Sequence, residues 1–196
     1  GASSAKYLIL LISLASLTWS GAYWGEAEAV SAGGIDWEDL NVLFVLLTGV
    51  LAIYRDRKIL WLSLLLAVVT IAAAWSSEIL RIDWLLVLSD VSFATYFGYV
   101  AVVILFDIGK TEGVTGDTII GAVCAYLLLG VMFGFIYSLI ELTQPGSFFA
   151  ASGVGAATSP LRHRDYANLI YYSFVTLSSV GYGDIVPVGR AARMVS

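Results

Sequence analysis

The chain has 196 residues, of which 59% are hydrophobic and 13% are charged. This composition lies outside the range of ordinary soluble domains and indicates a membrane protein. A formal charge of -5 provides no basic surface for nucleic acid, and no glycine-rich phosphate loop joins a strand to a helix. Because the sequence holds one cysteine and one histidine, an intrachain disulfide and a multi-histidine metal site are excluded.

Apolar runs of bilayer length dominate the first two thirds of the chain, since about 20 helical residues cross the hydrocarbon core. We interpret five of them as transmembrane helices: residues 7–24, 40–54, 59–76, 84–106 and 118–140. The expected fold class is therefore an all-α membrane protein. Residues 1–110 are predicted to form a four-helix bundle, and residues 111–196 a second domain.

Basic residues near the ends of the runs predict the orientation, because short cytoplasmic loops are enriched in Lys and Arg. If the helices alternate in direction, one side receives Lys6, Arg55, Arg57, Lys58 and Lys110. The opposite side receives mostly acidic residues. We predict a multi-pass protein of the cell membrane, in contact with lipid, with its N-terminus in the cytoplasm.

A loop and a short apolar segment follow the fifth run. Residues 143–160 are rich in Gly, Ser, Ala and Thr and predict an irregular loop. Residues 166–178 are apolar but too short to span, which predicts a re-entrant half-helix with Asp165 as its N-terminal cap or as a partner of its dipole. Irregular backbone at membrane depth requires burial in protein or a water-lined cavity, so the glycines that follow predict a cavity.

The residues after the half-helix are Ser179, Val180, Gly181, Tyr182 and Gly183. The two glycines permit backbone angles that other residues rarely adopt, so consecutive carbonyls can point the same way along an axis. The stretch resembles the TVGYG selectivity filter of tetrameric potassium channels, in which carbonyls replace the hydration shell of the ion. The resemblance is dense over residues 166–193 and points to a prokaryotic member of the six-transmembrane, pore-loop superfamily.

This resemblance implies specific roles. Residues 179–183 would bind K⁺, the permeant ion, with the Ser179 hydroxyl as the innermost ligand and the Tyr182 side chain turned away from the ions. No transition metal and no further cofactor is implied. The filter would be supported by Tyr171, Tyr172, Thr176, Ser178 and Asp184. Ringing an ion with carbonyls implies a homotetramer.

The sequence departs from the family pattern in the filter and in the fourth run. Ser178 and Ser179 replace threonines, and Val175 stands where some relatives place a carboxyl group that hydrogen-bonds the filter Asp. Residues 84–106 contain no Lys or Arg, so the usual gating charge is absent and weak voltage dependence is expected.

Further residues allow two readings each. Asp90 is an ionisable residue inside the fourth run and therefore a functional candidate, although we favour a structural role with water or a nearby Ser or Thr as its partner. His163 is either a solvated loop residue, the simpler reading, or an external proton sensor. Gly130 and Gly134 have the spacing of close helix packing, and a gating hinge is the alternative.

The sequence therefore predicts a potassium-selective channel subunit. A less selective cation channel and a non-conducting, channel-like accessory protein are the alternatives. An enzyme is not expected, because no nucleophile is paired with a base at membrane depth, and no nucleic-acid partner or small-molecule substrate is indicated. Only three residues follow Arg193, so the family's final inner helix is expected to be missing and the chain to be a piece of a longer subunit.

Overall fold

The computed structural model describes residues 2–24, 37–52, 57–80, 82–111, 113–150, 159–161 and 165–196. Five long helices come first in these residues: α1 (Ala2–Trp24), α2 (Trp37–Ala52), α3 (Arg57–Leu80), α4 (Asp83–Gly109) and α5 (Gly116–Thr143). Each coincides with one of the predicted apolar runs. The helix ends differ from the predicted ones by a few residues, because capping groups rather than hydropathy decide where a helix stops.

Three of the described helices are long and apolar enough to cross a membrane, by length and composition: Arg57–Ser77, Trp84–Gly109 and Gly116–Thr143. The α1 and α2 helices contain shorter apolar stretches, Lys6–Leu17 and Asn41–Ala52. The chain is thus a mainly helical membrane protein, while the number of five spans stays a prediction.

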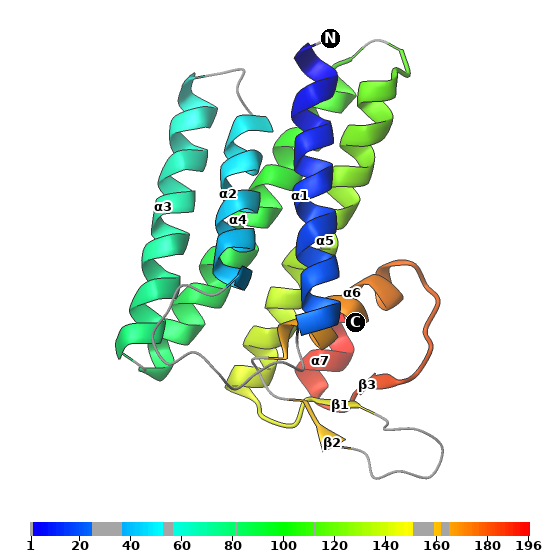
Figure 1. Ribbon diagram of the computed structural model, residues 1–196. Coiled ribbons are helices and arrows are strands. Elements are labelled where there is room, and N and C mark those ends of the chain that lie inside the picture. The colour runs from blue at the N-terminus through cyan, green and yellow to red at the C-terminus, as the bar shows by residue number, and fades with distance from the viewer. Residues whose placement is uncertain are drawn as a thin grey trace.

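The long helices pack side by side, with α4 lying along both α3 and α5 (Figure 1). Aromatic rings fill the α4–α5 contact: the Phe93 and Phe135 rings stack at 4.6 Å and the Phe97 and Phe135 rings at 5.9 Å. This core continues without a break across the predicted domain boundary at residue 110. The α4–α5 loop ends in a capping box, in which Thr118 N donates to Thr115 Oγ1 at 3.3 Å and fixes the start of α5.

The remaining elements are short and follow α5. They are β1 (Phe148–Ala150), β2 (Ser159–Pro160), α6 (Tyr166–Leu177), β3 (Ile185–Pro187) and α7 (Arg190–Val195). The start of α1 and the α4–α5 loop lie at one end of the molecule, and the strands lie at the other (Figure 1). Helix α6 covers the residues of the predicted half-helix and lies across the strand-side half of α5 (Figure 1), while its re-entrant position in a membrane stays a prediction.

The strands correct the prediction of an irregular loop over residues 143–160. They form an antiparallel sheet in the order β2-β1-β3, with Phe148 opposite Pro187 and Ala150 opposite Ile185. The two prolines of the sheet, Pro160 and Pro187, occupy its edge strands, where a missing N–H is tolerated. Strands of two or three residues carry no readable alternation, so hydropathy alone could not predict them.

Candidate functional site

The position of α6 is fixed by its close approach to α5 at two glycines. A Cβ added to Gly130 would lie 2.1 Å from the Phe174 ring, and one added to Gly134 would lie 2.4 Å from Ile170 Cγ1 and 3.0 Å from Ile170 Cα. The predicted close packing at Gly130 and Gly134 is therefore confirmed, with α6 as the partner helix.

A hydrogen bond reinforces this contact. The buried Ser173 hydroxyl lies 2.6 Å from the Gly130 carbonyl oxygen and donates to it across the interface. Ile170, Ser173 and Phe174 share one face of α6 because they are three and four residues apart. The half-helix thus presents a packed face to α5, and its C-terminal end is held at a defined place.

The candidate filter begins directly at that end of α6. The Val175 carbonyl oxygen accepts from Val180 N at 3.1 Å and from Gly181 N at 3.4 Å, while Ser179 N donates to the Thr176 carbonyl oxygen at 2.9 Å. These bonds fold the first residues of the stretch back onto the last turn of the helix. The Ser178 hydroxyl donates to the Phe174 carbonyl oxygen at 2.6 Å and adds to this anchor.

Backbone angles change sign along the stretch. Ser179, Gly181 and Gly183 have positive φ of 57°, 56° and 73°, whereas Val180 and Tyr182 do not. Glycine adopts such angles without a Cβ penalty, and Ser179 is the single described non-glycine residue with positive φ. The predicted need for Gly181 and Gly183 is confirmed, and the sign change at Ser179 is an addition that the sequence did not predict.

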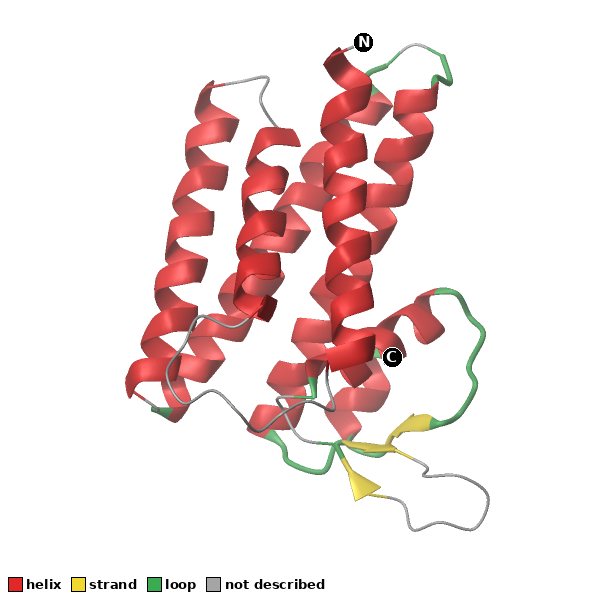
Figure 2. Ribbon diagram, viewed as in Figure 1, coloured by secondary structure: helices red, strands yellow, loops and turns green. Residues whose placement is uncertain are grey.

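The stretch is open to its surroundings. Figure 2 shows residues 178–184 as a loop at the side of the molecule, between α6 and β3. The Val180 side chain is 51% exposed and the Tyr182 side chain is 70% exposed. A Cβ at Gly181 or Gly183 would meet nothing within 4 Å. Within one chain, the conformation of residues 179–183 is set by their backbone angles and by their hydrogen bonds to the end of α6.

The two predicted support tyrosines lie in different surroundings. The Tyr171 hydroxyl donates to Asp184 Oδ2 at 2.8 Å, and Asp184 Oδ1 accepts from Ile185 N at 3.0 Å. The bond to Asp184 raises the pKa of the Tyr171 hydroxyl, so the phenol remains a donor at neutral pH. Val175 has no carboxyl group to bond Asp184, and the Tyr171 hydroxyl holds the Asp184 side chain instead.

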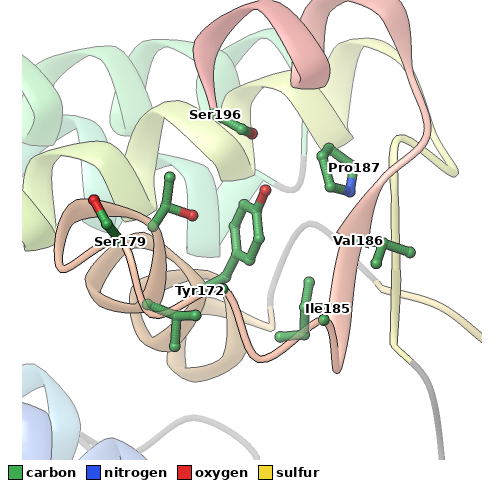
Figure 3. A pocket seen from close by; sticks show the side chains of 10 residues that line it. Tyr172, Ser179, Ile185, Val186, Pro187 and Ser196 are labelled. Carbon is green, nitrogen blue, oxygen red and sulfur yellow. The ribbon is translucent and has the colours of Figure 1, made fainter.

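Tyr172 instead lines a cavity of about 370 Å³ behind the stretch. Its ring lies between Ser179 on one side and Ile185 and Pro187 on the other (Figure 3). The ring also packs against Tyr137 at 5.2 Å and Phe148 at 5.5 Å, which links α6 to α5 and to β1. Thr176 lines the same cavity.

A buried carboxylate on α5 organises the far side of the site and was missed by the sequence reasoning. Glu141 accepts from Gly146 N at 2.6 Å, Ser147 N at 2.9 Å and Phe148 N at 3.1 Å. The Ser147 carbonyl oxygen then accepts from Val188 N at 2.8 Å. An acidic residue at the end of an apolar run, shortly before a Pro-Gly turn, was the available signal.

The structure describes Asp90 and Asp165, whose roles the sequence left open, but not His163. Asp90 is buried and accepts from Ser138 Oγ at 2.8 Å, which confirms a serine as one of its partners. Asp165 occupies the predicted N-cap position of α6 without a side-chain capping hydrogen bond, and the alternative role of its carboxylate as a partner of the helix dipole stays a prediction. His163 lies outside the described residues, and its role stays open.

Residues 121–196 match a family model described as an ion channel. The match begins within α5 and includes α6, the candidate filter and α7. The comparisons with curated proteins and with solved structures gave no match. This match supports membership of an ion channel family. It also supports ion transport across a membrane, rather than catalysis, as the function.

Proposed function

We propose that this chain is a subunit of a potassium-selective channel in which residues 179–183 form the filter. The observation that carries the proposal is the alternation of φ sign at Ser179, Gly181 and Gly183, directly after a half-helix that is clamped to α5. Alternation of this kind lets successive carbonyls face one side. Carbonyl oxygens facing a common axis replace the hydration shell of K⁺.

The proposed assembly is a homotetramer, because one chain supplies one side of each carbonyl ring. The exposed side chains of Val180 and Tyr182 support an oligomer, since apolar surface of this kind is normally covered by a partner. In the proposed channel, the carbonyls face the central axis and the Tyr182 ring packs away from it, against protein.

One feature of the helices supports cation transport, and a second supports the proposed orientation in the membrane. The C-terminal end of α6 adjoins the filter, and this end of a helix carries partial negative charge, which favours a cation nearby. Lys6, Arg57 and Lys110 lie at the ends of α1, α3 and α4 that are remote from the strands. In the proposed orientation, this end faces the cytoplasm and the filter opens toward the outside.

The decisive experiment measures ion selectivity of the full-length protein in planar bilayers. With K⁺ on one side and Na⁺ on the other at equal concentrations, a potassium-selective channel gives a reversal potential far from zero, with the K⁺ side negative. A reversal potential near zero would instead favour the less selective cation channel. Absence of current from verified, correctly inserted protein would favour the accessory protein.

A further inference from the structure

One buried carboxylate joins three helices at the start of α6. Asp90 on α4 has a side chain that is 1% exposed. Its Oδ2 accepts from Ser138 Oγ on α5 at 2.8 Å, and its Oδ1 accepts from the Tyr166 hydroxyl on α6 at 3.0 Å. Tyr166 is the first residue of α6. The carboxylate therefore connects the bundle to the beginning of the half-helix.

Burial of this carboxylate is unfavourable unless hydrogen bonds compensate it, so its presence requires an account. Packing between α4 and α5 already exists through Phe93, Phe97 and Phe135. The Tyr166 ring also packs on Phe135 of α5 at 5.3 Å, so apolar contacts already hold the start of α6 against α5. What the carboxylate adds is a directional bond between α4 and the N-terminal turn of α6.

The opposite end of α6 is bonded to the filter. The Val175 carbonyl oxygen holds Val180 N and Gly181 N, which are backbone groups of the proposed ion pathway. Between its two ends, α6 is a rigid element of 12 residues that is packed closely on Gly130 and Gly134. A change in position at the start of α6 would therefore reach the backbone of residues 180 and 181 through the length of this helix.

We propose that the Asp90–Tyr166 hydrogen bond couples α4 to the filter and holds the filter in its conducting geometry. This inference rests on the proposed channel function and adds to it a route of regulation: movement of α4 changes how long the filter conducts. The residues act by positioning α6, and neither touches the ion. Breaking the bond is expected to shorten conducting periods without changing which ion passes.

The test compares single-channel recordings of the full-length protein carrying Tyr166→Phe, Asp90→Asn or both. Tyr166→Phe removes the hydroxyl and keeps the ring on Phe135. Loss of a hydrogen bond to a charged group predicts an open probability that is at least about tenfold lower, with the reversal potential unchanged. The double variant is expected to lose less than the sum of the two single losses, because Asp90→Asn removes the charge from the same hydrogen bond that Tyr166→Phe removes.

The matched control is Tyr99→Phe, which removes a hydroxyl that α4 donates to the Ile59 carbonyl oxygen on α3, away from α6. It is expected to keep the wild-type open probability. Wild-type gating in Tyr166→Phe, or an equal loss in Tyr99→Phe, would overturn the coupling. If Asp90→Asn does not assemble, the comparison between Tyr166→Phe and Tyr99→Phe still decides.

A second measurement does not depend on current. Hydrogen–deuterium exchange reports the protection of the Val180 and Gly181 amides, which donate to Val175. Coupling predicts that these amides exchange about tenfold faster in Tyr166→Phe than in the wild type, and at the wild-type rate in Tyr99→Phe. Unchanged exchange in Tyr166→Phe contradicts the inference even if the wild type proves not to be potassium-selective.

Discussion

Two pairs of glycines, Gly130 with Gly134 and Gly181 with Gly183, are required for opposite reasons. At the first pair, an added methyl group meets α6 at 2.1 Å and 2.4 Å, so these glycines provide space. At the second pair, an added methyl group meets nothing within 4 Å, but φ is positive, so these glycines provide a backbone angle. The first pair of glycines sets the position of α6, and the second pair sets the backbone conformation of the residues that follow α6.

The largest expected effect is on the packing pair. Gly134→Ala places a methyl group 3.0 Å from the Ile170 backbone, which no side-chain rotation can relieve. We expect the free energy of unfolding to fall by about 2–3 kcal/mol. Thermal unfolding in detergent measures this loss.

Gly116→Ala is the matched control, since it lies on the same helix and meets nothing within 4 Å. It is expected to change the free energy of unfolding by no more than about 0.5 kcal/mol. Equal stability of Gly134→Ala and Gly116→Ala would show that α6 does not lie where the structure places it.

The second expected effect concerns the filter pair. Gly181→Ala or Gly183→Ala forces a Cβ into the left-handed region, at a cost of about 1–2 kcal/mol. The chain should stay folded and assembled, because no clash arises, while potassium-selective current is lost or made unselective. Bi-ionic reversal potentials and size-exclusion chromatography together measure both parts.

Gly113→Ala separates backbone strain from filter chemistry. Gly113 has a φ of 91° and open space around its Cβ position, but it lies in the α4–α5 loop, far from the filter in sequence. It should carry a similar folding cost and keep selectivity. Retained potassium selectivity in both filter variants would refute the filter assignment.

A smaller effect is expected at Tyr171. Tyr171→Phe keeps the ring and removes the 2.8 Å hydrogen bond to Asp184. We expect a loss of about 1 kcal/mol in the stability of the conducting filter, seen as faster decay of current during steady recording. Tyr99→Phe, which loses a hydroxyl on the other side of α4, should decay as the wild type does.

The smallest expected effect is that of voltage. Helix α4 contains no Lys or Arg, and each charge moved through 100 mV would contribute about 2.3 kcal/mol. Conductance–voltage curves should therefore be shallow. A conductance–voltage curve as steep as that expected for several gating charges per subunit would show that gating charge moves in another part of the molecule.

The long helices and the glycine roles were predictable because each follows from a local property. Apolar runs predict helices of bilayer length, and a Gly-Tyr-Gly sequence predicts unusual backbone angles without knowledge of any neighbour. The GxxxG spacing at Gly130 predicted close packing, but it did not identify α6 as the partner. Spacing within a helix says which face is flat, and only the fold says what lies on it.

The missed features depend on contacts between distant residues. Asp90 finds Ser138 and Tyr166 at separations of 48 and 76 residues along the chain. In the sequence, Tyr171 and Tyr172 form one adjacent aromatic pair. Neighbours on a helix point in different directions, so the Tyr171 hydroxyl bonds Asp184 while the Tyr172 ring lines the cavity. The β1–β3 pairing likewise joins segments that only the folded half-helix brings together.

That pairing has a consequence for the order in which the chain folds. Phe148 lies opposite Pro187, and the segment between them contains α6 and the whole filter. Bringing together the ends of a flexible loop of roughly 40 residues costs about 3 kcal/mol in chain entropy, whereas each helix forms from local contacts. We therefore expect the long helices to form first and the β1–β3 pairing to form last, after α6 and residues 179–183 have reached their folded conformation.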